Sequence, residues 1–349
     1  MMQIGYVPYS NDLSHPADRR RLKMWADYEG VNLNVGNPLR SDVLVLSGTS
    51  NFHYWRKKFK GPIVLDLIDG YLNYTPNMLE DVGRNIIRTL KNGSSLEFIR
   101  FTKYLESAVG HADFIVTSCP EQRESIAAIN PSTHDILDDH SELNSTEFPK
   151  ELKKGDSHEF TLLWEGYGST LKHLISKAEQ IDEFLFERKA RLILVTQANY
   201  PKYGNFLVKV KTQRLIEKNF PLSFDRITIH DWTIRNLISS AYQSNSSIIP
   251  INEDDNLAWA KPENKVLSFW TMNIPSLFSP IPSYARVAKL AGAENYLVKH
   301  SEWFDKLNEM YNNYDLIKHS VKEQRDYINK HHSRASLAAK WNQVFESIK

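Results

Sequence analysis

The stretch AKPENKVLSFWTMNIPSLF, residues 260–278, decides how the second half of this chain is interpreted. It predicts a loop, a short helix, a tight stop and a short strand. Pro262 suits a first helical position, because its missing N–H would have no helical partner there. Asn273 tolerates the left-handed conformation that often ends a helix, and Pro275 discourages continuation of the helix.

Lys261 and Lys265 place two cations at the start of this predicted helix. That end of a helix dipole is positive, so the lysines are electrostatically misplaced there. An anion held by the free N–H groups would resolve the conflict, and a diphosphate is the obvious candidate. The alternative is two solvated lysines with Glu263 as local compensation, because lysines cost little at an exposed helix end.

Short apolar runs recur along the chain and are separated by longer amphipathic stretches. The runs are rich in Val, Ile and Leu and do not alternate, which is typical of strands buried on both faces. The helical patterns between them predict parallel sheets covered by helices on both sides. The predicted strands cover residues 4–7, 43–46, 63–68, 114–117, 160–164, 192–196, 227–229, 247–250, 276–278 and 296–298, and the predicted helices cover 17–29, 77–109, 170–188, 209–219, 234–243 and 284–292.

The chain of 349 residues suggests about two domains. The pattern pauses in a polar stretch over 131–157, which resembles a connection between domains. We therefore predict an N-terminal Rossmann-like domain over 1–150, a C-terminal one over 151–320, and a C-terminal helix over 321–349 that packs back toward the first domain. Ligands of such sheets bind beyond the carboxyl ends of the strands, so a cleft between the domains is expected there.

The composition is that of a soluble globular protein, with 41% hydrophobic and 24% charged residues. A formal net charge of +1 argues against a nucleic-acid partner. No apolar run approaches the roughly 20 residues of a membrane span, and the N-terminus has no signal-peptide pattern. We expect a cytoplasmic protein, with peripheral contact at the inner face of a membrane left open. The single cysteine, Cys119, fits a reducing compartment and is interpreted as a buried small residue.

Motifs for common cofactors and metals are missing from the sequence. There is no Gly-rich dinucleotide fingerprint, P-loop or paired zinc signature, so we expect no cofactor and no metal. The runs 134–140 and 253–255 contain metal-ligand residue types. We interpret the first as solvated linker and most of the second as a solvated turn, because like-charged blocks are usually solvated.

Two loops of the second half are candidates for ligand binding. Gly166, Tyr167 and Gly168 follow the predicted strand 160–164 and form a plausible anion cradle, because backbone N–H groups can approach a ligand closely there. An ordinary capped turn is the alternative. Trp232 follows the strand 227–229 and fits either stacking on a nucleobase or core packing, which is the usual fate of a lone tryptophan.

Polar residues also follow the strands of the first half. Ser10, Asp12, Asn51 and Asp69 lie at strand ends that should face a cleft. Asp69 fits either contact with an acceptor hydroxyl or capping of the following turn. The basic run 19–21 is interpreted as a solvated helix face.

Three segments resemble a known family. Residues 246–251, 112–118 and 261–265 together with 273–275 are similar to segments of the retaining group-1 glycosyltransferases of the GT-B fold, and the last is the most specific. It resembles the family's Lys-x-x-Asn-Lys helix and Gly-x-Pro turn, with Asn273 in place of the glycine. Two glutamates that the family commonly carries would fall at Ala260 and Ser268, so both are missing.

The resemblance implies a two-domain GT-B architecture and transfer of a sugar from a nucleotide-sugar. Lys261 and Lys265 would neutralise charge on the leaving diphosphate, which makes a metal unnecessary. Asp69 would face the acceptor, together with Ser10, Asp12 and Asn51. The donor-binding residues that we expect on the C-terminal domain are Gly166, Tyr167, Trp232, Glu263, Asn264 and Ser268.

The function predicted from the sequence is therefore glycosyl transfer in the synthesis of a surface glycan or another glycoconjugate. The acceptor is left open among a glycan, a lipid-linked molecule and a protein. Because both family glutamates are missing, a non-catalytic nucleotide-sugar-binding subunit is one alternative. A sugar-nucleotide epimerase on the same architecture is another.

Overall fold

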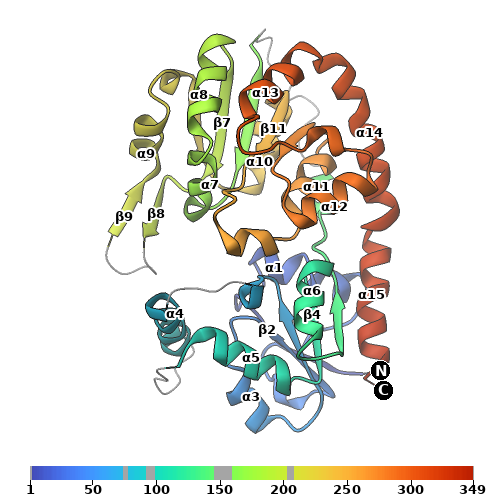
Figure 1. The fold of residues 1–349 in the computed structure, drawn as a ribbon. Helices are drawn as coiled ribbons and strands as arrows, with labels where there is room; N and C mark the ends of the chain where they lie inside the picture. Colours follow the sequence, from blue (N-terminus) through green and yellow to red (C-terminus); the bar gives the residue numbers. More distant parts are fainter. Residues whose placement is uncertain (1, 74–77, 92–98, 145–158, 203–207, 349) are drawn as a thin grey trace. The chain divides into compact units, whose positions relative to one another are not determined.

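The computed structural model describes residues 2–73, 78–91, 99–144, 159–202 and 208–348. The chain forms two compact α/β units (Figure 1). Unit 1 contains Met1–Asp139, Trp259–Pro262 and His331–Lys349, and unit 2 contains His140–Ala258 and Glu263–Lys330. The chain thus passes into unit 2 after Asp139 and returns to unit 1 finally at His331. The sequence predicted these boundaries near 150 and 320.

Unit 1 is built on a sheet of parallel strands whose spatial order follows the sequence. Four of them match predicted strands, whereas β5 lies where no strand was predicted. Asn34 forms an isolated parallel bridge with Gly5 on the other side of β1. The chain therefore changes direction across β1, and the carboxyl ends of β1, β2 and β3 lie next to that switch point. The strands are β1 (Ile4–Val7), β2 (Val43–Ser47), β3 (Ile63–Leu67), β4 (Phe114–Thr117) and β5 (Thr133–Asp135).

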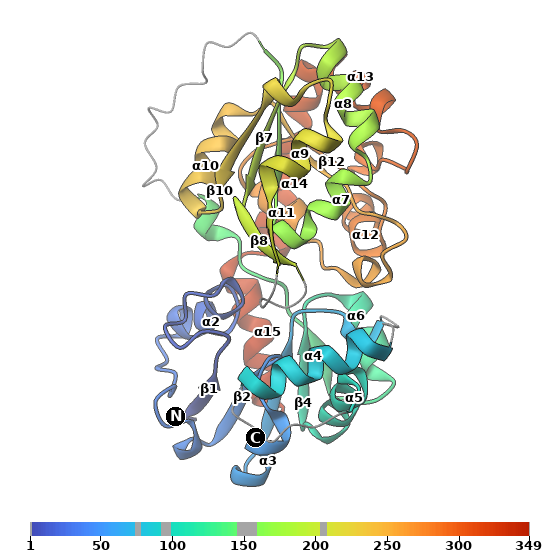
Figure 2. The same ribbon diagram turned by 90° about the vertical axis from the view of Figure 1, so that its left-hand side faces the viewer.

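Helices cover this sheet, and the C-terminal helix is one of them (Figure 2). α15 packs on α2: the Trp25 ring lies 4.6 Å from the Phe345 ring, and Trp25 Nε1 donates to Asn342 Oδ1 at 2.8 Å. The predicted helix 77–109 is two helices, and residues 92–98 lie outside the described part. The helices of unit 1 are α1 (Pro16–Arg19), α2 (Leu22–Glu29), α3 (Phe52–Lys58), α4 (Met78–Lys91), α5 (Phe101–His111), α6 (Pro120–Ala127) and α15 (Arg334–Glu346).

Unit 2 has a second parallel sheet, with the order β10-β7-β6-β11-β12. The chain moves outward from β6 through β7 to β10 and then returns to the other side of β6. The topological switch point therefore lies between β6 and β11, where such sheets bind ligands. The predicted strand at 296–298 is only an isolated bridge from Leu297 to Phe278. The strands are β6 (Thr161–Glu165), β7 (Arg191–Thr196), β10 (Ile227–Asp231), β11 (Ser246–Ile249) and β12 (Ser276–Phe278).

An antiparallel hairpin in unit 2 is absent from the sequence prediction (Figure 1). It joins β8 (Asn199–Lys202) and β9 (Val208–Lys211), and β9 occupies the start of the helix predicted over 209–219. The alternation of Val and Lys over 208–211 is the period-2 signal of a strand. The helices of unit 2 are α7 (Leu171–Ile175), α8 (Ala178–Glu187), α9 (Thr212–Asn219), α10 (Ile234–Gln243), α11 (Asn264–Thr271), α12 (Pro282–Leu290), α13 (Trp303–Asn312) and α14 (Tyr314–His331).

The stretch 260–278 folds largely as predicted, with one correction. Asn273 has φ 59°, the left-handed value expected at the helix end, and β12 begins directly after Pro275. Pro262, however, is not the first helical residue, because α11 begins at Asn264. The segment Trp259–Pro262 belongs to unit 1, where Gln122 Nε2 donates to Ala260 O at 2.7 Å.

Candidate functional site

Lys265 lies at the switch point of the unit 2 sheet. It is the second residue of α11, and its Nζ donates to the carbonyl of Glu165, the last residue of β6, at 2.6 Å. The same Nζ lies 3.7 Å from Glu165 Oε1 and 5.2 Å from the centre of the Trp164 ring. The helix after β11 therefore delivers a partly exposed cation to the carboxyl end of β6.

Glu165 connects this lysine to an aromatic pair. Trp232 Nε1 donates to Glu165 Oε2 at 2.9 Å, and the Trp232 and Tyr167 rings stack with centres 6.0 Å apart. Trp232 is therefore not a core residue, although core packing was the commoner expectation. Glu165 itself was missed as a site residue. Its position at the carboxyl end of the central strand is the sequence signal that could have identified it.

Gly166 keeps space open for the Lys265 ammonium group. A Cβ at Gly166 would lie 2.7 Å from Lys265 Nζ and 2.5 Å from Thr170 Oγ1, both closer than a methyl group tolerates. Both atoms end movable side chains, so a larger residue would displace them rather than the backbone. A glycine at this position therefore fixes where the lysine lies.

We expect Gly166→Ala to weaken the binding of a nucleoside diphosphate while changing the free energy of unfolding by less than about 1 kcal/mol, the usual size of Gly-to-Ala effects at compatible backbone positions. Calorimetric titration with nucleoside diphosphates and urea unfolding measure the two quantities. Gly166→Ala and Lys265→Ala should be non-additive, because both act through the lysine position. Additive losses would contradict this coupling.

Three other predicted donor residues occupy different environments within unit 2. Glu263 is fully buried, and its Oε1 accepts from Arg286 Nη2 at 2.8 Å. Ser268 is also buried, with its hydroxyl 3.1 Å from His140 Nδ1. Asn264 is the first residue of α11, directly before Lys265. Arg286 and His140, like Glu263 and Ser268, belong to unit 2.

Tyr284 lies close to the acidic groups of this region. Burial and then the carboxylates of Glu165 and Glu263 raise the pKa of its phenol well above the ordinary value. The hydroxyl group therefore stays protonated at neutral pH.

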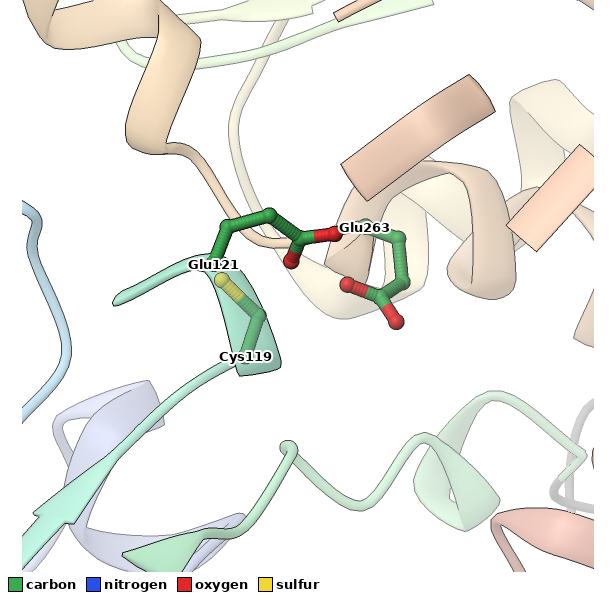
Figure 3. Close-up of side chains that lie close together, drawn as sticks. All are labelled: Cys119, Glu121 and Glu263. Carbon is green, nitrogen blue, oxygen red and sulfur yellow. The ribbon is translucent and has the colours of Figure 1, made fainter. Parts of the chain in front are cut away.

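Figure 3 draws Cys119 and Glu121 at the beginning of α6 and Glu263 just before α11. Cys119 is the N-cap residue of α6 and is fully buried, as expected for a small packed residue. Glu121 lies in the first turn of α6, where the positive end of the helix dipole stabilises a carboxylate. Cys119 and Glu121 belong to unit 1 and Glu263 to unit 2.

Lys261 is assigned to unit 1 and Lys265 to unit 2. The positive charge of Lys261 acts on the carboxyl group of Asp69 and lowers its pKa. Crowding by surrounding atoms raises the pKa of the Asp69 carboxyl group, whereas Lys261 and a hydrogen bond from Tyr71 oppose the rise. The carboxyl group is nevertheless exposed to solvent, which limits the rise. Because α11 begins at Asn264, Lys265 lies in its first turn and Lys261 precedes the N-cap residue Glu263. The phosphate role of Lys261 stays a prediction.

The other predicted acceptor residues stabilise loops of unit 1. Ser10 donates from its N and Oγ to Asp18 Oδ2, at 2.9 and 3.1 Å. Asp12 is exposed and accepts from Ser14 N and Oγ. Asn51 caps α3 by accepting from Tyr54 N at 3.2 Å. Each of these polar groups has a local structural contact at a strand end.

No helix within the described residues is both long and apolar enough to cross a bilayer. No family model and no curated protein matches the sequence. Solved structures do match. HepE from Anabaena in complex with UDP-glucose has a TM-score of 0.66 at 11% identity, over 100% of this chain and 99% of that one. A glycosyltransferase from Rickettsia africae has a TM-score of 0.64 at 13% identity, over 99% and 97%.

TarM is also similar, with a TM-score of 0.58 at 11% identity over 87% of this chain. This chain spans about half of TarM, 54% of its length. At such low identities the similarity concerns the fold. Together with the two parallel-sheet units, it shows that this chain has the GT-B fold, as the sequence predicted.

Proposed function

We propose that this chain is a glycosyltransferase that takes its sugar from a nucleotide-sugar bound by unit 2. The observation that carries the proposal is the Lys265 ammonium group at the carboxyl end of β6, beside the topological switch point. A fixed cation there suits a diphosphate. The stacked Tyr167 and Trp232 rings add an aromatic surface that suits a nucleobase or a sugar ring.

The proposed reaction breaks the bond between the anomeric carbon and the diphosphate oxygen, and the electron pair remains on that oxygen. A new bond forms from the acceptor hydroxyl oxygen to the same carbon, and the hydroxyl proton leaves to a base. Lys265 would stabilise the charge that develops on the diphosphate, which is commonly a large catalytic contribution. Glu165 would hold the lysine in place through its backbone carbonyl.

We also propose a stereochemical outcome, a metal requirement and an acceptor, which are based on the family resemblance alone. They are retention of the anomeric configuration, no metal ion, and a glycan, lipid-linked or protein acceptor contacted by unit 1 near Asp69. The similarity to HepE makes UDP-glucose the first donor to test, because that protein was solved with UDP-glucose. We propose that the reaction serves the synthesis of a surface glycan or another glycoconjugate. The proposed location is the cytoplasm, and the alternative is the inner face of a membrane, bound peripherally.

A non-catalytic donor-binding protein is the second candidate. It is favoured by the residues at the two family glutamate positions, because Ala260 is a buried alanine of unit 1 and the Ser268 hydroxyl contacts His140. Glu165 is the carboxylate that lies beside Lys265. A catalytic protein would therefore have to use carboxylates at other positions.

The test is a calorimetric titration with a panel of nucleotide-sugars, paired with an assay of nucleotide release with and without candidate acceptors. Binding and acceptor-dependent release support glycosyl transfer. Binding without release under any acceptor supports the non-catalytic candidate, and an epimerised sugar formed without acceptor supports an epimerase. If no nucleotide-sugar in the panel binds, the proposal is wrong.

A further inference from the structure

Glu165 places a carboxylate beside the lysine proposed to bind the diphosphate. Its Oε1 lies 3.7 Å from Lys265 Nζ, and the side chains of Glu165 and Lys265 are 12% and 29% exposed. Among the residues that the structure describes, Glu165 supplies the one carboxylate in ion-pair contact with this lysine. The proposed diphosphate site therefore carries a negative charge next to its cation.

Trp232 fixes the Glu165 carboxylate in this position. Glu165 Oε2 accepts from Trp232 Nε1 at 2.9 Å, and the Trp232 ring stacks on the Tyr167 ring with centres 6.0 Å apart. An indole N–H is a donor without charge, so it orients the carboxylate and leaves the negative charge in place. Rotation of the carboxylate away from Lys265 would break this hydrogen bond.

Lys265 is held by a neutral group as well. Its Nζ donates to the backbone carbonyl of Glu165 at 2.6 Å, whereas the separation of 3.7 Å from Oε1 is too long for a hydrogen bond. An ammonium group has three donors, so donors remain for the oxygens of a diphosphate. A diphosphate bound there would lie near both the lysine and the carboxylate.

The substrate and the product of the proposed reaction differ in charge at this place. A nucleotide-sugar has a diphosphate that is esterified at both ends, whereas the nucleotide product has a free terminal phosphate. Because the electron pair of the broken bond remains on the phosphate oxygen, the product carries about one more negative charge at neutral pH. The Glu165 carboxylate therefore repels the product more strongly than the substrate.

We propose that Glu165 is a specificity-determining residue of the donor site, which weakens the binding of the nucleotide product relative to that of the nucleotide-sugar. The inference rests on the proposed function, because it requires a diphosphate at Lys265. The pair is mostly shielded from solvent, so salt screens the repulsion less than it would on an open surface. Lys265 attracts the diphosphate, and Glu165 limits how tightly the product is retained.

The experiment is calorimetric titration of the whole chain and of Glu165→Gln with three matched pairs, UDP with UDP-glucose, ADP with ADP-glucose, and GDP with GDP-mannose. Glutamine keeps the backbone carbonyl for Lys265 and a side-chain oxygen for Trp232, and it removes the charge. Within a pair that binds, both ligands should gain affinity, and the nucleotide should gain about 10-fold more, the size expected for one added charge several ångströms away. Equal gains, or no gain, would overturn the proposal.

Two further variants separate the charge of Glu165 from its shape. Glu165→Asp keeps the carboxylate but shortens the side chain that reaches Trp232, so the ratio of the two dissociation constants should stay within about 3-fold of that of the unaltered chain. Glu183→Gln removes the same charge from an exposed position on α8 and should change the ratio by less than about 2-fold. A change as large as that of Glu165→Gln in either variant would show that the charge of Glu165 is not the cause.

The same titrations distinguish a failure of this inference from a failure of the proposed function. If a nucleotide and its nucleotide-sugar both bind, and Glu165→Gln strengthens them equally, the specificity role alone is refuted. If no ligand of the three pairs binds either the unaltered chain or Glu165→Gln, the proposed function is wrong, and the role of Glu165 is wrong with it.

Discussion

Replacing Lys265 by alanine should weaken the binding of UDP by about 10- to 100-fold and leave the binding of uridine nearly unchanged. The expected loss corresponds to a hydrogen bond with a charged group, about 1.5–3 kcal/mol. Lys265 Nζ is partly exposed and is held by Glu165 O, so it is available to a diphosphate without moving far. Calorimetric titration with both ligands measures the ratio.

Lys289→Ala is the matched control for this experiment, because Lys289 is an exposed lysine near the end of α12. It removes the same charge from unit 2 and should leave UDP binding within about 2-fold, the size of a screened surface effect. Lys265→Arg should retain part of the affinity, since the charge remains. If Lys265→Ala weakens UDP and uridine equally, Lys265 has no phosphate role.

Arg21→Met should lower the free energy of unfolding by about 3–5 kcal/mol, the usual result of breaking a buried ion pair by removing one partner. Arg21 and Asp66 are both fully buried, and Arg21 Nη2 lies 2.5 Å from Asp66 Oδ1. Arg21 also donates to the carbonyl of Ile136. The pair therefore ties α2's N-cap to β3 and to the segment after β5. Urea unfolding followed by circular dichroism measures the loss.

The pH dependence of this loss identifies its cause. Burial raises the pKa of Asp66, and Arg21 opposes that rise, so removing Arg21 lets the pKa rise further. A carboxyl group with a raised pKa in the folded state contributes stability below its unfolded pKa, and this contribution is lost as the pH rises through the folded pKa. The deficit of Arg21→Met should therefore be large at pH 7 and shrink as the pH falls toward about 4.

A double variant completes the test. Arg21→Met combined with Asp66→Leu replaces both buried charges by apolar groups and should recover much of the lost stability at pH 7. Asp66→Leu alone should be destabilising, because it leaves the guanidinium buried. A deficit for Arg21→Met that is the same at pH 4 and pH 7 would show that lost packing, not an uncompensated carboxylate, is responsible.

The sequence predicted most of the strands because buried parallel strands carry a local signal, a short run of Val, Ile and Leu. It failed where the signal was weak or mixed. The hairpin strand β9 (Val208–Lys211) was predicted as the beginning of a helix over 209–219. The strand predicted at 296–298 is a single bridge. Local periodicity shows that a segment is extended, but pairing with a neighbour decides whether it joins a sheet.

The candidate site was predicted unevenly for the same reason. Lys265 and Trp232 both contact Glu165, the neighbour of Gly166. Each of Lys265, Gly166 and Trp232 follows a strand of one sheet or begins the helix after it, which sequence order reveals. Glu165 was missed because its role depends on two contacts from distant segments, Lys265 and Trp232. Their functional roles remain predictions until ligands are tested.

By itself, the sequence determined the fold class, the parallel sheets and the helix stop at Asn273, because each depends on periodicity or on the conformation of a single residue. Only the tertiary structure decided which charges are buried and which belong together. Lys261 and Lys265 are four residues apart in the stretch 260–278, yet they belong to different units. Arg21 was interpreted as a solvated residue, yet it is paired with Asp66 across 45 residues of sequence. Burial and charge pairing depend on neighbours that are distant along the chain.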